Sequence, residues 1–265
     1  MHGDDITSDS NGQDCYRFVK AAGRFKVVKR TPGISTTDLV GRMLLCTRTH
    51  FIRSLDRTLA GEEGSGSAEE RKGRGEEMRV RIEEYASDET GRAPGSEVWS
   101  WRPTKARRRA SAAGKSLSAR SREDEGEFRQ MVRGKGMRAG QRVVYVDGGF
   151  DLFSSGHIEF LRRVVEAEEE VGRQRGWYDE GAARRRKEET GEDYGPVYVV
   201  AGVHDDEVIN EWKGVNYPIM NIFERGLCVL QCKVSVPSAL LVALEAHTLL
   251  TRLSTHNDHS STSTP

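Results

Sequence analysis

Residues 143–157, Val-Val-Tyr-Val-Asp-Gly-Gly-Phe-Asp-Leu-Phe-Ser-Ser-Gly-His, decide the fold. The apolar run that opens this stretch, 143–146, is typical of a buried parallel strand. Gly148 and Gly149 end the strand and let the backbone approach a ligand closely. A helical pattern of apolar residues follows over 158–165. The N–H groups at the start of such a helix would face a phosphate at the carboxyl end of the sheet.

A second buried strand is predicted at 197–200, after a charged segment at 166–193. We interpret the charged segment as a solvated helical insertion rather than as a binding element. Strand, helix and strand at this spacing form a right-handed βαβ unit. The predicted fold class is therefore α/β, with a Rossmann-like parallel sheet.

The composition divides the chain of 265 residues, of which 36% are hydrophobic and 31% charged. Such a balance predicts a modest core together with long solvated segments. We expect a partial domain over 1–50, a low-complexity, disordered linker over 51–140 and a second partial domain over 141–233. The tail, 234–265, is predicted to start with an apolar helix over 234–253.

Within 1–50, the alternation of Phe25, Val27 and Val28 predicts a strand. A helix is expected to start at 35–38, where hydroxyl side chains can cap the free N–H groups. Four cysteines occur without a zinc-ligand pattern, and we expect reduced thiols.

Charge and hydropathy exclude several classes of function. Lys plus Arg and Asp plus Glu are equal at 41 each, so the overall charge does not favour specific nucleic acid or an anionic membrane as partner. The basic stretch 101–122 is interpreted as solvated linker, with RNA binding as the alternative ranked last. No apolar run approaches the ~20 residues of a transmembrane segment, and the start of the chain does not resemble a signal peptide. We expect a cytoplasmic protein.

Positions 154 and 157 carry the sharpest chemistry, because residues three apart share one face of a helix turn. Two imidazoles there would bracket the α-phosphate of a nucleotide and neutralise the charge that grows during transfer. His157 is in place, but Ser154 occupies the other position. Serine cannot carry a positive charge, and loss of one such donor typically costs about a hundredfold to a thousandfold in rate.

Three motifs carry a resemblance to a known family. Residues 147–157 resemble the HxGH signature of the cytidylyltransferases, and 217–225, Tyr-Pro-Ile-Met-Asn-Ile-Phe-Glu-Arg, look like their PIMNxxER segment. Residues 30–42, Arg-Thr-Pro-Gly-Ile-Ser-Thr-Thr-Asp-Leu-Val-Gly-Arg, resemble the RTxGISTT motif that closes such a domain. The RTxGISTT motif precedes the HxGH signature here, so the chain resembles the tandem family of the ethanolamine-phosphate cytidylyltransferases, in a truncated form.

The resemblance implies transfer of CMP from CTP to phosphoethanolamine, which gives CDP-ethanolamine and pyrophosphate. It implies His157 as the catalytic donor, with Ser154 beside it, Lys213 and Arg225 as cationic clamps, and Mg²⁺ bound with the substrates rather than at a protein metal site. The nucleotide-binding residues that it implies are Gly148, Gly149, Phe150 and Asp151 in the second domain, and His2, Gly3, Asp4, Asp5, Arg30, Thr31, Ser35, Thr36 and Thr37 in the first.

Two hypotheses stay open for the chain. One is the transferase, with a homodimer as its expected assembly. The other is a catalytically degenerate module that binds nucleotide or regulates a complete partner domain, which Ser154 favours. Binding of CTP without release of pyrophosphate would distinguish the second from the first. For 35–37, simple helix capping is the alternative to phosphate binding.

Overall fold

The fold was derived from a computed structural model, which describes residues 2–3, 8–28, 35–88, 90–103, 126–232 and 240–245. The chain forms two compact units, 1–41 and 42–265. In the first unit, strand β1 (His2–Gly3) pairs in parallel with β2 (Val27–Val28), and helix α1 (Arg17–Ala21) lies between them in sequence. The predicted strand at Val27 and Val28 is confirmed.

Helix α2 (Thr36–Leu45) begins in the first unit and ends in the second. The expected helix start is confirmed, because the N–H of Asp38 lies 3.4 Å from the Ser35 hydroxyl, a long capping contact. Four residues that the sequence pointed to, Asp4, Asp5, Arg30 and Thr31, lie outside the described residues.

The second unit is built on a five-stranded sheet with the strand order β4-β3-β7-β6-β5. Its strands are β3 (Glu97–Pro103), β4 (Gly126–Val132), β5 (Arg142–Gly148), β6 (Val197–Val203) and β7 (Leu240–Leu244). All neighbours are parallel except β3 and β4. The register pairs Asp147 with Gly202, so β5 and β6 end at the same edge of the sheet. The predicted α/β class with a parallel sheet is confirmed.

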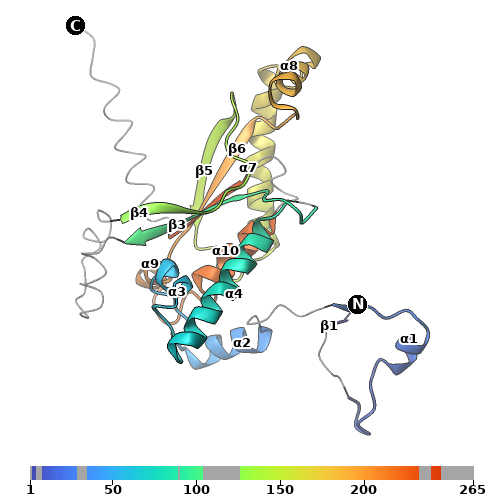
Figure 1. The fold of residues 1–265 in the computed structure, drawn as a ribbon, viewed down its shortest axis with the longest axis vertical. Helices are drawn as coiled ribbons and strands as arrows, with labels where there is room; N and C mark the ends of the chain where they lie inside the picture. The colour runs from blue at the N-terminus through green and yellow to red at the C-terminus, as the bar shows by residue number, and fades with distance from the viewer. Residues whose placement is uncertain are drawn as a thin grey trace. The chain divides into compact units, whose positions relative to one another are not determined.

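Helices cover this sheet (Figure 1). The helices that contact its strands are α3 (Leu55–Leu59), α4 (Ala68–Ala86), α7 (Ser155–Gln174) and α10 (Ile222–Leu230). The second unit also contains α8 (Glu180–Thr190), which lies beyond the end of the sheet in Figure 1, and α9 (Asp206–Lys213). Helix α10 packs on β6, β7 and α4, and α7 packs on β6. Buried side chains such as Leu161, Val199 and Leu227 fill the space between these layers. None of the helices within the described ranges is long and apolar enough to cross a bilayer.

The structure differs from the disordered linker that was predicted over 51–140. Helices α3 and α4 and strands β3 and β4 all fall in this range. Their surfaces are polar, but Ile82, Val98 and Trp101 are buried at 2% exposure or less. A few apolar side chains therefore pack this mainly polar segment into the core. A capping box fixes the start of α4, in which Ser67 and Glu70 each accept the backbone N–H of the other. Residues 104–125 lie outside the described residues.

The tail also differs from its prediction. The apolar run was expected to form a helix over 234–253, yet Leu240–Leu244 is strand β7. It pairs in parallel with β3 on one side and β6 on the other. Val242, Ala243 and Leu244 are at most 1% exposed. Backbone pairing on both sides and burial of these side chains outweigh the helix propensity of leucine and alanine.

Candidate active site

A glycine-rich turn stands at the carboxyl ends of β5 and β6. In open parallel sheets, ligands bind in the crevice at this edge. The N–H of His204 donates to the carbonyl of Gly148 at 3.1 Å, which ties the two strand ends together. A Cβ atom at Gly149 would lie 3.2 Å from Cδ1 of Ile209 in α9, so glycine lets this helix pack closely on the turn.

Beyond the glycines the backbone is strained. Phe150 and Leu152 have positive φ values of 49° and 47°, a region that residues with side chains rarely adopt. Such strain persists where the surroundings hold the backbone in place, and it clusters at functional sites. Phe150 is buried at 4% exposure, so its side chain packs into the core.

Arg225 of α10 stabilises the glycine-rich turn through hydrogen bonds to backbone carbonyls. Its guanidinium donates to the carbonyls of Met220, Gly149 and His204 at 2.9, 2.6 and 2.7 Å. It also donates to Asp206 Oδ1 at 2.6 Å, and both side chains are fully buried. The sequence pointed to Arg225 as a clamp on phosphate. The structure corrects that role, since a guanidinium with no exposed surface and these four partners fixes the turn rather than the ligand.

Asp206 completes this buried centre at the start of α9. Its Oδ2 accepts the backbone N–H of Ile52 at 2.8 Å. Burial raises the pKa of Asp206 to about 6, although the Arg225 guanidinium opposes that shift. The pair therefore connects the glycine turn with the segment that follows α2.

Asp151 clips the turn to the loop before α10. Its carboxylate accepts the N–H groups of Ile219 and Met220, each at 2.8 Å, and that of Leu152 at 3.0 Å. Through these bonds Asp151 stabilises the backbone beside the site. The sequence had instead predicted that Asp151 contacts the nucleotide. Charge-assisted bonds of this kind position the two segments firmly.

His157 lies in the first turn of α7 and is half-buried. Its Nδ1 accepts the backbone N–H of Ser154 at 3.1 Å, and the Ser154 hydroxyl lies 3.3 Å away. The ring stacks on Phe153, with the centroids 5.1 Å apart. A nitrogen that accepts a hydrogen bond carries no hydrogen, so in the neutral imidazole Nε2 holds the proton and can donate it in a hydrogen bond.

His204 and Asp147 are residues of this edge that the sequence reasoning missed. The Nε2 of His204 lies 3.5 Å from Oδ2 of Asp147, so an imidazole and a carboxylate face each other across the ends of β6 and β5. Burial and the nearby Asp147 raise the pKa of Tyr145 on β5. In the sequence, each of these polar residues follows an apolar run at the end of a predicted strand, and that position could have identified both.

Lys213 ends α9 and is exposed. Its ammonium lies 5.6 Å from the ring centroid of Tyr217. The intervening loop is held by Asn210, whose side chain donates to the carbonyl of Tyr217 at 2.7 Å. Lys213 is therefore an accessible cation at the end of a helix, and its role as a clamp stays a prediction.

Two further side chains that the sequence reasoning passed over fix the loop before α10. Arg42 donates to the carbonyl of Ile219 at 2.9 Å, and the imidazole of His50 lies 2.7 Å from the carbonyl of Pro218. Arg42 also makes a two-pronged ion pair with Glu224 of α10. The end of the RTxGISTT-like motif thus belongs structurally with the second unit.

The other residues expected from the first motif lie in the first unit. Ser35, Thr36 and Thr37 are at the start of α2, and the backbone of His2 and Gly3 forms β1. The two units are separate compact bodies, and the phosphate-binding role of these residues stays a prediction.

A dedicated metal cage is not found among the described residues, which bring no group of three or more His, Cys, Asp or Glu side chains together. Mg²⁺ is usually bound through substrate phosphates and one or two carboxylates. Asp147, about a quarter exposed at the carboxyl end of β5, is a carboxylate of that kind. The donor set therefore fits Mg²⁺ that is held mainly by a triphosphate.

Comparison with known proteins gives a consistent result. No family model matches the chain. Among curated proteins, "Ethanolamine-phosphate cytidylyltransferase" of Mus musculus is 35% identical over 242 residues, which covers 88% of this chain and 46% of the relative. Proteins with the same name from Dictyostelium discoideum and Arabidopsis thaliana are each 31% identical over 88% of the chain, and the match covers 46% and 41% of their lengths. The chain spans about half the length of the curated relatives it matches.

Proposed function

Since the chain belongs to the family of the ethanolamine-phosphate cytidylyltransferases, we propose that its second unit binds CTP at the glycine turn and transfers CMP to phosphoethanolamine. The observation that carries this proposal is the His157 imidazole, whose Nδ1 is engaged by the Ser154 N–H at 3.1 Å while Nε2 is left to donate. In the first unit, Ser35, Thr36 and Thr37 would hold phosphate on their own account.

The reaction is a single in-line displacement. An oxygen of the phosphoethanolamine phosphate attacks the α-phosphorus of CTP and forms a new P–O bond. The bond from the α-phosphorus to the oxygen of the β-phosphate breaks, so CDP-ethanolamine and pyrophosphate leave as products. Enzymes accelerate such transfers mainly by positioning the groups and by stabilising charge.

Each residue then has one task. His157 Nε2 would donate to an α-phosphate oxygen, where negative charge grows in the transition state. The exposed Lys213 would bind the phosphates of CTP as a point charge. Arg225 and Asp151 would hold the turn in place without touching the substrate. Mg²⁺, when bound with CTP, would shield the leaving pyrophosphate.

A second candidate function is binding of nucleotide without turnover. The Ser154 hydroxyl lies 3.3 Å from His157 Nδ1, where it cannot supply a second positive charge. On this reading the chain would bind CTP and serve a complete partner domain. A cytoplasmic location and a homodimer are further predictions from the sequence.

Two measurements on the purified chain separate the candidates, namely CTP affinity by calorimetry and pyrophosphate release with CTP, phosphoethanolamine and Mg²⁺. The transferase requires release that is lost in His157→Ala and persists in Glu159→Ala, an exposed change two residues further along α7. Binding of CTP without release would leave the second candidate. Absence of both from a folded chain would overturn the proposal.

A further inference from the structure

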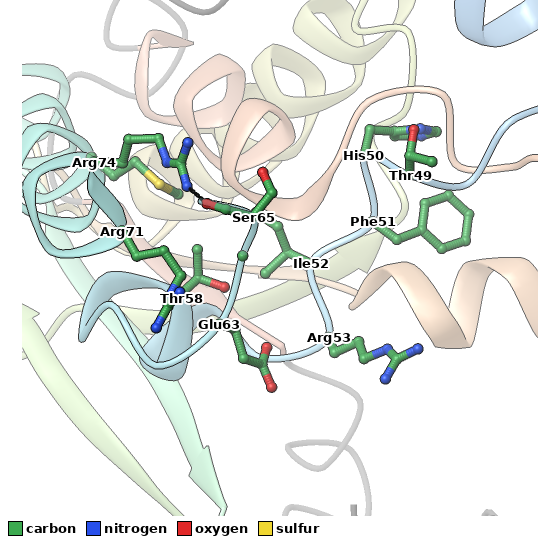
Figure 2. A pocket seen from close by; sticks show the side chains of 12 residues that line it. Thr49, His50, Phe51, Ile52, Arg53, Thr58, Glu63, Ser65, Arg71 and Arg74 are labelled. Atoms are coloured by element: carbon green, nitrogen blue, oxygen red, sulfur yellow. Dashed lines mark hydrogen bonds between the residues drawn. The ribbon is translucent and has the colours of Figure 1, made fainter. Parts of the chain in front are cut away.

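A pocket of about 520 Å³ lies between the segment 49–53 and the first half of α4 (Figure 2). Figure 2 shows Arg71 and Arg74 on the α4 side, with Ile52 and His50 on the opposite side and Ser65 between them. The volume falls within the roughly 300–1,000 Å³ that is usual for small-molecule sites.

The lining is strongly basic. Three arginines line the pocket, Arg53, Arg71 and Arg74, against one acidic residue, Glu63. The Glu63 carboxylate is itself paired with Arg57, whose Nη1 lies 2.8 Å from Oε1. An excess of positive charge in a concave site attracts anions.

The arginines of α4 are held in place by backbone carbonyl groups. Arg71 donates to the carbonyls of Gly61 and Gly66 at 3.0 and 2.6 Å, and Arg74 donates to the carbonyl of Ser65. Carbonyl oxygens fix the orientation of a guanidinium but carry no net charge to cancel it. Across the described residues, no carboxylate forms an ion pair with Arg53, Arg71 or Arg74.

The loop that carries these carbonyls, 61–66, is shaped by glycine. Gly64 and Gly66 have φ values of +113° and +91°, which favour glycine over other residues. The Glu70 carboxylate accepts the N–H of Ser67 at 2.7 Å, and this bond together with the nearby Arg74 guanidinium lowers the pKa of Glu70. The hydroxyls of Thr49 and Ser65 add hydrogen-bond donors to the lining.

We propose that this pocket is a binding site for a ligand with a phosphate group, separate from the active site. Guanidinium groups match the oxygens of phosphate in pairs and form charge-assisted hydrogen bonds with them. The ligand is either a polyphosphate, such as a nucleotide or pyrophosphate, or a phosphomonoester. None of the lining residues belongs to the glycine turn, although two of them also contact its supports: His50 lies 2.7 Å from the carbonyl of Pro218, and the N–H of Ile52 donates to Asp206.

The test is calorimetric titration of the chain with inorganic pyrophosphate, with phosphoethanolamine and with CTP. We expect Arg53→Gln and Arg74→Gln to weaken binding of the ligand by about tenfold or more, as loss of a charge-assisted bond does. The matched control is Lys72→Gln, which removes one exposed positive charge from α4 outside the pocket, and it should change affinity by less than about twofold. Arg53 is exposed and, among the described residues, forms no side-chain ion pair, so its variant should keep the fold even if Arg74→Gln does not.

The titrations identify the ligand and can overturn the proposal. Arginine-dependent binding of pyrophosphate or CTP alone indicates a polyphosphate, and equal binding of phosphoethanolamine indicates a phosphomonoester. The variant His157→Gln should leave this binding unchanged. Binding that survives both arginine changes but is lost in His157→Gln would assign it to the active site and overturn the proposal. Absence of saturable binding by all three ligands would also overturn it.

Discussion

Arg42 and Glu224 form a buried two-pronged ion pair that joins the last turn of α2 to the first turn of α10. The Nη1–Oε2 and Nη2–Oε1 distances are 2.8 and 3.0 Å, and the two side chains are 10% and 6% exposed. Glu224 also accepts the N–H of Asn221 at 2.8 Å and so caps the helix that carries Arg225. Arg42, the last residue of the RTxGISTT-like motif and the first of the second unit, thus contacts the PIMNxxER-like motif at a buried ion pair.

Removal of Arg42 should strongly destabilise the second unit. The change Arg42→Met leaves the Glu224 carboxylate buried without its partner, which typically costs about 3–5 kcal/mol. Arg48→Met, at an exposed position six residues later, should change the free energy of unfolding by less than about 0.5 kcal/mol. Urea unfolding of both variants measures the difference. A double variant, Arg42→Met with Glu224→Gln, should recover part of the lost stability. If Arg42→Met and Arg48→Met are equally stable, the buried ion pair is contradicted.

Two glycines of α4 should respond to alanine in opposite directions. A Cβ at Gly75 would lie 2.4 Å from the carbonyl oxygen of Leu59 in α3, so Gly75→Ala forces the helices apart and lowers stability. Nothing lies within 4 Å of a Cβ at Gly73, so Gly73→Ala should raise stability by up to about 1 kcal/mol through helix propensity. Thermal unfolding of both variants tests the packing of α3 on α4. If both changes stabilise the chain, α4 does not pack as described.

The buried carboxyl of Asp206 should give stability a distinct pH dependence. Its folded pKa of about 6 lies above the ordinary value of 3.8, so the folded state holds its proton more tightly than the unfolded state. The resulting contribution to stability is complete below pH 3.8 and is lost as pH rises through 6, a change of at most about 3 kcal/mol. The difference in unfolding free energy between wild type and Asp206→Asn should therefore fall between pH 4 and pH 7. A constant difference would contradict the raised pKa.

The four free thiols should react in two classes. Cys15 and Cys46 are exposed, whereas Cys228 and Cys232 are more buried, and burial raises the pKa of each of the latter pair to about 11. Since the thiolate is the reactive species, alkylation at pH 8 should modify the first pair quickly and the second pair slowly. Mass spectrometry over time measures this order, and urea should abolish it. Uniform modification of the native chain would contradict the packing of α10.

The sequence reasoning succeeded where hydrophobic pattern and turn chemistry agree. Val143–Val146 formed a parallel strand, and the glycines after it ended that strand as expected. The prediction of a helix at Leu240–Leu244 is wrong, because a short run of leucine and alanine is compatible with either helix or strand. The segment forms a strand because it pairs with β3 on one side and β6 on the other.

The same limit applies to the site. The motif located Arg225 but could not show that Asp206 and three carbonyls surround it, which turns an expected phosphate clamp into a buried support. Nor could composition reveal α4, whose capping box and Gly75 contact hold a helix with few apolar residues in place. Side-chain roles of this kind depend on tertiary contacts between segments that are distant in sequence.

The most direct test of the proposed transferase is to restore the imidazole at position 154. Pyrophosphate release from CTP and phosphoethanolamine with Mg²⁺ is measured for wild type, Ser154→His and the double variant Ser154→His with His157→Ala. We expect Ser154→His to raise the rate by about a hundredfold or more, because loss of one preorganised donor typically costs that much, and we expect the double variant to lose the gain. Circular dichroism confirms that each variant is folded. If folded Ser154→His binds CTP and releases pyrophosphate no faster than wild type, the assignment of the helix turn 154–157 as the catalytic centre is contradicted.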